Sequence, residues 1–148
     1  MKARDIMTTD VITLPPDCLI GDLVRKLAEM KLQAFPVVDA NGNLLGIVNI
    51  WRLLRHVLPP YIVSGDLVDV RFAPDLNQLH ERLASMRNQP VSAIMNRKPP
   101  TVRPDHSVLE CAALMLNTPK TVYLLPVVDE SGRFLGIIAP LDLIKEIA

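Results

Sequence analysis

An internal repeat is the feature of this sequence that most constrains its fold. Two segments that begin near Met7 and Met95 share a pattern, and their matching residues lie 88 positions apart at first and 90 positions apart further on. The second copy therefore holds two extra residues, around 118–120. Two copies are too few for a solenoid, which needs about three or more units. We therefore expect the copies to pair about a pseudo-two-fold axis. The matching residues are Ile-Met at 6–7 and 94–95, Thr13 and Thr101, Asp17 and Asp105, Pro-Val-Val-Asp at 36–39 and 126–129, and Leu-Gly-Ile at 45–47 and 135–137.

Each copy predicts the same order of elements, β-α-β-β-α. Apolar residues spaced by three and four predict a helix, and the apolar runs around the Asp-x-x-Gly turns predict two strands. Asp17 and Asp105 are candidate N-caps, and Ser107 with Glu110 fits a capping box. The strands are too apolar to alternate, so we expect sheets buried on both faces. The predicted fold is α/β, with two such motifs paired into one compact module. The expected segments are strands at 11–14, 35–38 and 44–48 with helices at 20–30 and 51–58, then strands at 101–102, 124–128 and 134–138 with helices at 108–116 and 141–147.

The repeat also sets the domain boundaries, with a first motif at 1–58, a connector at 59–90 and a second motif at 91–148. Pro59 and Pro60 end the first motif's last helix. A further helix is expected near 75–88, because Leu76, Leu79, Leu83 and Met86 form one apolar stripe. We expect this stripe to pack on the module, whereas residues 61–73 show no clear pattern.

Composition excludes several classes of protein. The chain has 148 residues, 16 Lys and Arg against 16 Asp and Glu, and 49% hydrophobic residues. A disordered chain would have fewer apolar residues and a larger net charge. A nucleic-acid binder would have an excess of basic residues. No apolar run reaches the ~18 residues of a membrane span, and the start lacks the apolar segment of a signal peptide. Cys18 and Cys111 stand far apart, and the three histidines lack nearby acidic or Cys companions, so we expect no metal site and a cytoplasmic protein.

These motifs resemble those of the CBS domain, named after cystathionine β-synthase. The resemblance rests on Ile-Met-Thr at 6–8, Pro-Asp before a helix, and Pro-Val-Val-Asp-x-x-Gly-x-Leu-x-Gly-Ile at 36–47, and it covers about residues 2–55 and 91–147. It implies a tandem pair, or Bateman module, whose clefts bind an adenosine-containing ligand such as AMP, ADP, ATP or S-adenosylmethionine. It also implies a homodimer that regulates a separate enzyme or transporter.

In adenosine-binding members of this family, the closing helix begins Gly-h-h-(Thr/Ser)-x-x-Asp, where h is apolar, and the Asp accepts hydrogen bonds from the ribose. In the second copy Asp142 matches this Asp, and Ala139 replaces the hydroxyl residue. A carboxylate suits a diol, and the helix N-terminus beside it suits a phosphate. The alternative is that Asp142 only complements the helix dipole.

In the first copy Asn49 stands at the hydroxyl position and Arg52 at the Asp position. Arginine cannot accept a hydrogen bond from ribose, but its guanidinium can donate a fork of hydrogen bonds to phosphate. The alternative is an ordinary surface arginine. The two clefts are therefore expected to be chemically unequal.

The resemblance places the rest of each cleft before the first strand and on the Pro-bearing strand. Backbone groups near Ile12 and Pro100 would read the adenine edge, with apolar side chains around the ring; alternatively these apolar residues belong to the core. Trp51 would cap a cleft, join a dimer contact or simply be half-buried. The expected residues are Thr8, Val11, Ile12, Thr13, Gln33, Phe35 and Pro36 for the first copy, and Asn96, Pro99, Pro100, Thr101, Tyr123, Leu125 and Pro126 for the second, with Arg97, Lys98, Arg103 and Lys120 as phosphate partners or solvated charges.

Three functions remain open from the sequence. The first is a sensor module that binds an adenosine-type ligand and signals by a conformational or dimer change. The alternative is a structural or dimerisation module that binds no nucleotide, which Ala139, Arg52 and the paired prolines 99 and 100 favour. An enzyme acting on a nucleotide is disfavoured, because no catalytic triad, P-loop or pair of cleft acids can be read.

Overall fold

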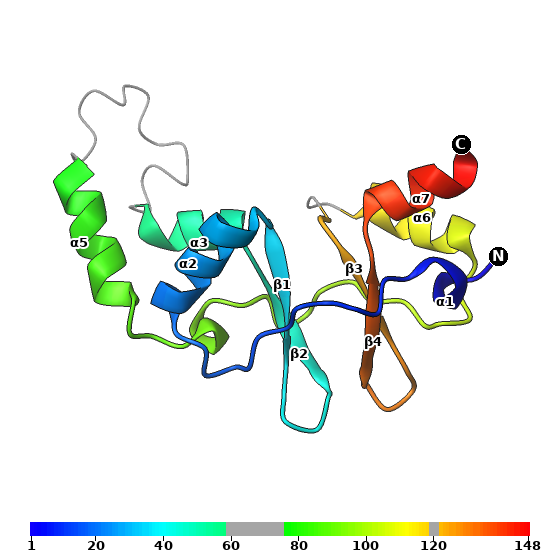
Figure 1. Cartoon of the computed structure of the whole chain (residues 1–148), viewed down its shortest axis with the longest axis horizontal. Coiled ribbons are helices and arrows are strands. Elements are labelled where there is room, and N and C mark those ends of the chain that lie inside the picture. The colour runs from blue at the N-terminus through cyan, green and yellow to red at the C-terminus, as the bar shows by residue number, and fades with distance from the viewer. Residues whose placement is uncertain (59–75, 119–121) are drawn as a thin grey trace.

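The computed structural model describes residues 1–58, 76–118 and 122–148, and it contains the two predicted motifs in one compact module (Figure 1). The mixed α/β fold is therefore confirmed. Residues 61–73 lie outside the described residues. The elements are α1 (Ala3–Ile6), α2 (Ile20–Met30), β1 (Ala34–Val38), β2 (Leu44–Asn49), α3 (Ile50–Val57), α5 (Leu76–Met86), a 3-10 turn (Val91–Ala93), α6 (Val108–Asn117), β3 (Leu125–Val128), β4 (Phe134–Ile138) and α7 (Pro140–Ile147).

Each motif contains one antiparallel hairpin, β1–β2 in the first and β3–β4 in the second. The Asp-x-x-Gly repeat forms both turns, in which Gly42 and Gly132 have φ of 87° and 88°. Asp129 Oδ1 accepts hydrogen bonds from the Ser131 hydroxyl and from the backbone N–H groups of Ser131 and Arg133, at 2.7, 2.9 and 3.0 Å. The hydrogen bond from the Ser131 hydroxyl is the main reason that the pKa of Asp129 lies below its ordinary value.

The expected strands at 11–14 and 101–102 are shorter than the sequence suggested. Each forms a single parallel bridge to its hairpin, Leu14 with Val37 and Val102 with Val127. The Leu14 N–H donates to the Pro36 carbonyl at 2.9 Å, and the Val102 N–H donates to the Pro126 carbonyl at 3.0 Å. These bridges fix the chain beside the hairpins without a full third strand.

The first helix of each motif begins two residues later than an Asp N-cap requires. Leu19 is the N-cap of α2, and Asp17 lies in the turn before it, which the Cys18 N–H closes onto the Pro15 carbonyl at 3.1 Å. Ser107 is the N-cap of α6, so the predicted role of Asp105 is also wrong. The capping box is confirmed, because Ser107 and Glu110 exchange side-chain and backbone hydrogen bonds of 3.0 and 3.1 Å.

The described residues form one hydrophobic core in each motif, and each core receives residues from the arm that opens the other copy. The first core contains Val91, Ile94 and Met95 beside α2, β1 and β2. The second core contains Ala3, with Met7 packed against it. We call residues 2–8 and 90–96 the exchanged arms, because each arm lies on the motif to which it does not belong in sequence.

The repeated glycines of β2 and β4 are the points where the exchanged arms lie closest. Ile47 and Asn96 exchange backbone hydrogen bonds of 3.0 and 2.7 Å, and Thr8 and Ile137 exchange bonds of 2.8 and 2.9 Å. A Cβ atom at Gly46 would lie 2.4 Å from the Asn96 carbonyl oxygen, and one at Gly136 would lie 2.6 Å from that of Thr8. The Leu-Gly-Ile repeat therefore leaves room for an arm.

The two hairpin turns also contact each other. The Leu44 N–H donates to the Gly132 carbonyl at 3.1 Å, and the Phe134 N–H donates to the Gly42 carbonyl at 2.8 Å. Figure 1 shows both turns on one side of the molecule, with α3 and α7 on the opposite side. The pairing is thus two-fold in character, as the repeat predicts.

The connector helix α5 lies beside α3. Arg82 Nε donates to the Val57 carbonyl at 2.7 Å, and Met86 is buried in the first core. Leu79 and Leu83 are half-buried. Among the described residues, no helix is long and apolar enough to cross a bilayer.

Candidate functional site: a cavity between the two motifs

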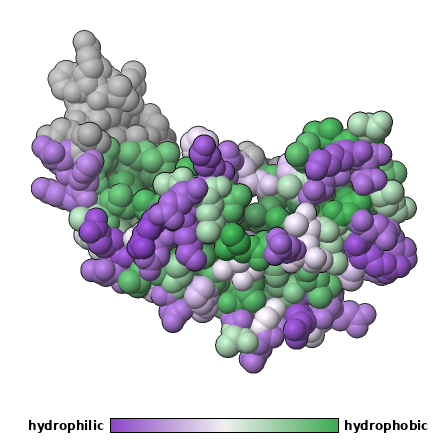
Figure 2. All heavy atoms as spheres, in the orientation of Figure 1, coloured by the Kyte–Doolittle hydropathy of each residue, from purple (hydrophilic) through white to green (hydrophobic). Residues whose placement is uncertain are grey.

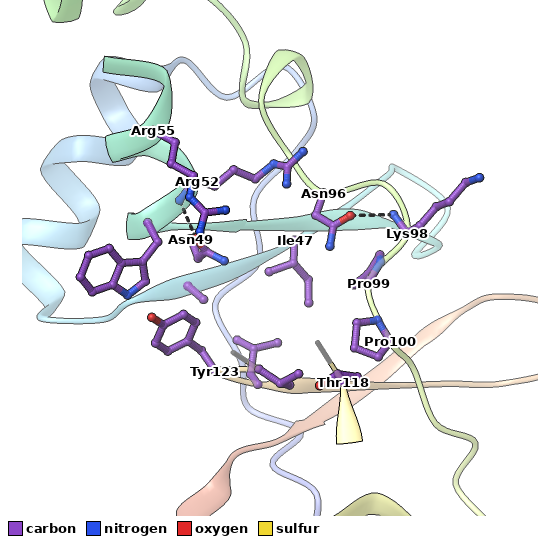
Figure 3. Close-up of a pocket in the computed structure, with 14 residues that line it drawn as sticks. Ile47, Asn49, Arg52, Arg55, Asn96, Lys98, Pro99, Pro100, Thr118 and Tyr123 are labelled. Carbon is purple, nitrogen blue, oxygen red and sulfur yellow. Dashed lines mark hydrogen bonds between the residues drawn. The ribbon is translucent and has the colours of Figure 1, made fainter. Parts of the chain in front are cut away.

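A cavity of about 840 Å³ lies where the two motifs meet (Figure 3). Its volume is in the range of sites for small molecules, about 300–1,000 Å³. Both copies contribute to its walls, so a ligand inside would contact both. The lining residues are Ala34, Ile47, Asn49, Trp51, Arg52 and Arg55 from the first motif, and Asn96, Lys98, Pro99, Pro100, Thr118, Val122, Tyr123 and Leu124 from the second.

One exchanged arm builds the wall that faces α3. The backbone bridge between Asn96 and Ile47 holds this arm at β2, and the chain then runs along the cavity through Lys98, Pro99 and Pro100. Prolines have no N–H, so Pro99 and Pro100 present apolar rings and carbonyl oxygens. This wall is apolar around its middle and polar at Asn96.

Arg52 is the cation that is held most firmly at the cavity. Its backbone N–H donates to Asn49 Oδ1, the side-chain cap of α3, at 2.7 Å. Its Nε donates to the carbonyl oxygen of Ile94 in the exchanged arm. A guanidinium has five N–H donors, so four remain after this bond. Arg52 therefore offers a half-buried charge in a fixed position.

The other charges at the cavity have the same sign. Arg55 lies one helical turn after Arg52, and Lys98 lies on the opposite wall, where Figure 3 shows its side chain running outward. None of the described lining residues is acidic. The N-terminus of α3, which carries partial positive charge, lies beside Asn49. The cavity is therefore suited to an anion.

Both asparagines at the cavity accept one backbone hydrogen bond at their side-chain oxygens. Asn49 Oδ1 accepts from Arg52, and Asn96 Oδ1 accepts from the Lys98 N–H at 3.1 Å. Figure 3 shows the Asn96 amide nitrogen turned away from Lys98. Each of these side chains can therefore donate to a ligand through its N–H₂ group and can still accept through the second lone pair of its oxygen.

The structure brings together eight of the residues that the sequence singled out, but in a different grouping; besides the five compared next, these are Trp51, Lys98 and Pro99. Asn96, Pro100 and Tyr123 line the same cavity as Asn49 and Arg52. The sequence analysis had placed the first three with Asp142, and Thr8 with Arg52. The grouping is corrected by the exchanged arms, since the arm before each first strand lies on the other motif.

The remaining predicted residues lie outside this cavity. Asp142 Oδ2 accepts from the Ala139 N–H at 2.8 Å at the start of α7, and Thr8 bridges Ile137 at the end of β4. Pro36 and Pro126 are fully buried and their carbonyls are paired, so they belong to the core rather than to a ligand-facing wall. Phe35 and Leu125 are likewise buried, Val11 and Thr13 are half-buried, and Ile12, Gln33 and Thr101 are exposed.

Several lining residues were not singled out from the sequence. A position three residues after Arg52 shares its helix face, and this signal points to Arg55. The sequence has no comparable signal for the other lining residues that were not anticipated, which are small or apolar. Of the other proposed phosphate partners, Arg97 donates to the Ser92 carbonyl at 2.9 Å and does not line the cavity, nor does Arg103, and Lys120 lies outside the described residues. The positions not anticipated are Ala34, Ile47, Arg55, Thr118, Val122 and Leu124.

The two cysteines do not belong to the cavity. Burial raises the pKa of both thiols, so Cys18 is not activated by the helix that follows it. Cys111 is part of the second core. Within the described ranges no cluster of three His, Cys, Asp or Glu side chains is placed to hold a metal ion.

Comparison with known proteins identifies the family of this chain. The family model of the CBS domain matches residues 3–59 and 91–148, so the chain belongs to the CBS domain family, as a tandem pair. A CBS domain-containing protein of Dictyostelium discoideum is 32% identical over 141 residues, which cover 95% of this chain and 87% of that protein.

Two solved structures resemble the chain along almost its whole length. CBSX2 from Arabidopsis thaliana, in complex with AMP, is 25% identical with a TM-score of 0.72, over 99% of this chain and 95% of that one. A protein from Methanocaldococcus jannaschii, described as a putative archaeal homologue of γ-AMPK, is 24% identical with a TM-score of 0.78, over 99% of this chain and 48% of that one. The second likeness shows the fold alone.

Proposed function

We propose that this chain is a regulatory module that senses an adenosine phosphate such as AMP, and that it does not act as an enzyme. The observation that carries the proposal is the cavity that both motifs line, with the fixed charge of Arg52 in its wall. The AMP complex of the similar CBSX2 supports an adenine nucleotide as the ligand. ADP, ATP and S-adenosylmethionine are the competing candidates.

The ligand would lie across the two motifs. Its phosphate would bind at Arg52 and the N-terminus of α3, where charge-assisted hydrogen bonds are strongest. Its purine would lie among the apolar side chains of Ile47, Val122 and Pro100, with the aromatic ring of Tyr123 beside them. In this placement the charged part of the cavity orients the ligand, and the apolar part buries the surface of the purine.

Signalling would follow from the fact that one ligand contacts both motifs. A ligand shifts a conformational balance only by its differential affinity for the two states. A nucleotide held between Arg52 and Pro100 favours the arrangement in which α3 lies close to the segment that follows the exchanged arm. The regulated partner would be a separate enzyme or transporter, and two free thiols suit the reducing cytoplasm.

A second, weaker position is proposed at the start of α7. Asp142 lies there, and the exchanged arm brings Thr8 to Ile137, two residues before Ala139. A carboxylate can accept from ribose hydroxyls, but Ala139 provides no hydroxyl. The position at Asp142 is therefore negatively charged and the cavity at Arg52 is positively charged, so we place the phosphate in the Arg52 cavity.

We further propose that the module is a homodimer. The apolar helix face consists of Ile50, Trp51 and Leu54 on α3 with Leu141, Ile144 and Ile147 on α7, and between 41% and 80% of each residue is exposed. Figure 1 places both helices on the side opposite the hairpin turns, and Figure 2 shows hydrophobic surface around α7. Leu54 and Ile144 occupy matching positions in the repeat, so both motifs contribute apolar residues to this face. In a homodimer the same face of each subunit would pack against its copy about a two-fold axis.

A thermal-shift panel of AMP, ADP, ATP, S-adenosylmethionine, adenosine and GMP tests the sensor function. A ligand at 100 times its Kd adds about 2.7 kcal/mol to the free energy of unfolding. We expect an adenosine phosphate to raise the Tm, and Arg52→Gln to abolish most of this shift. Arg4→Gln, which removes an exposed arginine on α1, serves as the charge-matched control and should keep the shift.

The other outcomes identify the alternatives. A dimer whose Tm responds to no nucleotide would favour the structural module, for which the apolar helix face is the supporting observation. Consumption of the nucleotide during incubation would favour an enzyme. A shift that Arg52→Gln and Arg4→Gln reduce equally would show that the phosphate binds elsewhere.

A further inference from the structure

We propose that His106 is a pH-sensitive latch that fastens the exchanged arm at residues 2–8 to the second motif. In its neutral form the imidazole closes the turn that holds this arm, and in its protonated form it cannot do so. The other exchanged arm, at residues 90–96, is held by a turn that has no histidine. Acidification therefore loosens one arm and leaves the other in place.

The turn at 103–106 holds the arm through backbone hydrogen bonds. The carbonyl oxygen of His106 accepts from the Ala3 N–H at 2.8 Å, and that of Pro104 accepts from the Arg4 N–H at 3.0 Å. Ala3 is fully buried in the second core, and Figure 1 shows α1, which forms most of this arm, beside the second motif. The position of the first residues of the arm therefore depends on the shape of this turn.

His106 closes the turn with its own side chain. The His106 N–H donates to the Arg103 carbonyl at 3.1 Å, and His106 Nδ1 accepts from the Arg103 N–H at 3.1 Å. An imidazole nitrogen accepts a hydrogen bond only when it carries no proton, so the neutral ring with its proton on Nε2 is the form that fits. Protonation of Nδ1 would set two donors against each other and leave the Arg103 N–H without this acceptor.

No acidic side chain offsets the charge that protonation would add. Within the described ranges, no carboxylate forms an ion pair with His106. Asp5 and Glu110 accept from backbone N–H groups, and Asp105 is exposed. Arg103 Nη1 is buried and has no hydrogen-bond partner among the described residues, so an imidazolium would add a second cation to a turn that already holds an unpaired one. The charged groups on the turn, on the arm and on the elements packed against them are the amino terminus, Lys2, Arg4, Asp5, Arg103, Asp105, Glu110 and Asp129.

The matching turn of the first copy has neither the histidine nor the N–H that it satisfies. Cys18 stands at the position of His106, and Pro15 stands at the position of Arg103. Proline has no N–H, so this turn needs no side-chain acceptor. It holds its own arm in the same way, since the Cys18 carbonyl accepts from the Val91 N–H at 2.7 Å. The turn at His106 is therefore the one of the two that changes near neutral pH, where histidine titrates.

Release of the arm would alter one end of the module and spare the other. Thr8, at the end of the arm, bridges Ile137 of β4, close to the start of α7. The Arg52 cavity is lined instead by Asn96 of the other arm. Acidification therefore removes a neighbour from the start of α7, whereas the Arg52 cavity keeps its wall.

Amide hydrogen exchange, measured by NMR on the full chain at about pH 7.5 and about pH 5.0, tests the proposal, because histidine changes its charge between these values. Ala3 and Arg4 report the arm at His106, and Val91 and Ser92, at the matching positions, report the other arm. Protection is expressed relative to an unfolded peptide at the same pH. We expect the protection of Ala3 and Arg4 to fall by at least about 10-fold at the lower pH, and that of Val91 and Ser92 to change by less than about 3-fold.

His106→Asn separates the titration from the hydrogen bond. The Asn side-chain oxygen can accept from the Arg103 N–H but takes up no proton in this pH range, so we expect equal protection of the arm at both pH values. His106→Leu removes the acceptor and should leave Ala3 and Arg4 poorly protected at both. His80→Asn, which replaces an exposed histidine on α5, is the matched control and should behave like the wild-type chain.

Several results would overturn the proposal. Protection at Ala3 that is unchanged at the lower pH, or that falls equally at Val91, shows that His106 does not control the arm. The same fall in His106→Asn excludes the imidazole, and this result decides the question even where His106→Leu does not fold. A nitrogen chemical shift that shows a proton on His106 Nδ1 at neutral pH, or the absence of protection at Ala3 there, contradicts the latch directly. None of these measurements uses a nucleotide, so their outcome is independent of the proposed sensor function.

Discussion

At the scale of single residues, Gly46 and Gly136 determine whether the exchanged arms can reach their places. Both positions face a backbone carbonyl and a methionine sulfur of the arm, and these contacts leave no room for a Cβ atom. The glycines of the Leu-Gly-Ile repeat are therefore explained by packing between the copies. Only the Gly46 contact involves Asn96, which lines the Arg52 cavity.

Gly46→Ala and Gly136→Ala should each lower the free energy of unfolding by about 1–3 kcal/mol, because the opposing atoms are backbone and cannot rotate away. Urea unfolding measures this loss. Gly46→Ala should also weaken AMP binding, since it displaces Asn96, whereas Gly136→Ala should leave the Arg52 cavity able to bind. Fluorescence of the single tryptophan, Trp51, reports that binding because it lines the cavity. Equal effects of the two variants on affinity would contradict the assignment of Asn96.

At this scale, the sequence identified several residues that line the cavity, but it did not identify which residues lie beside them. Arg52 and Asn49 stood out because they replace the family's acid and hydroxyl residue, and both line the cavity. Pro36 and Pro126 were proposed for the ligand because of their place in the motif, and they are buried. When a whole strand is apolar, its sequence does not alternate, so the pattern does not show which of its side chains are buried in a core.

At the scale of elements, α3 and α7 begin at matching positions of the repeat but are capped in different ways. Asn49 accepts from the N–H of Arg52, three residues later, and Ala139 has no side chain that can do so. At α7 Pro140 occupies the first helical position, and Asp142 accepts from the Ala139 N–H. At α3 the side chain of the N-cap residue accepts from an N–H group of the first helical turn. At α7 a side chain of the first turn accepts from the N–H group of the N-cap residue, and the proline at the first helical position has no N–H group to satisfy.

Asn49→Ala should therefore destabilise the protein by about 1 kcal/mol, within the range of about 0.5–2 kcal/mol for loss of an N-cap. Ala139→Ser should stabilise it, because it adds the missing cap to a helix that already has Pro at its first position. Denaturant midpoints at constant m-value measure both changes. If Ala139→Ser destabilises the fold, the space beside Asp142 is closed and the comparison of the two caps fails.

Most elements were predictable from the sequence because the repeat shows each of them twice. The described helices of each motif follow the three-and-four spacing, and both hairpins follow the Asp-x-x-Gly turns. Helix α1 was missed because four residues carry too little periodicity. The helix starts at 20 and 108 were predicted correctly, but the N-caps were assigned to Asp17 and Asp105, because an Asp in a preceding turn and an Asp at an N-cap look alike in sequence.

At the scale of the whole molecule, the apolar residues of α3 and α7 lie on the same side, opposite the hairpin turns (Figure 1). Half of Trp51 and more than half of Ile144 are exposed, which is a large apolar exposure for one side of a small protein. Arg52 and Arg55 lie on the same α3 as Trp51 and Leu54. The proposed dimer contact and the proposed ligand cavity thus share a helix, and occupancy of one would bias the other.

Ile144→Asp should convert the dimer to a monomer, because a charge at a closed two-fold interface meets its own copy and loses water. Sedimentation equilibrium measures the change. Ala40→Asp adds the same charge at an exposed position in the β1–β2 turn, on the opposite side of the molecule, and should leave the dimer intact. A wild-type chain that sediments as a monomer would contradict the proposed interface directly.

The overall fold could be predicted from the repeat, but the composition of the site could not. Grouping Asn96 with Arg52 requires knowing that the arm at 90–96 lies on β2, and this contact joins residues that are distant in the chain. Local patterns in a sequence do not determine such contacts. The repeat itself left both arrangements open, since each arm has an equivalent partner in the other copy.

The exchanged arms have a consequence for the ancestry of this chain. A gene encoding a single copy would produce a protein whose own arm leaves its hairpin, so that Gly46 or its equivalent would lack a covering strand. Two such polypeptides exchanging arms would restore the backbone contacts of both exchanged arms and form a closed, symmetric swapped dimer. Joining the two genes end to end would then convert an association that depends on concentration into one folded chain. The divergence of Arg52 from Asp142 would have required two copies of the gene, since the subunits that one gene encodes carry identical residues.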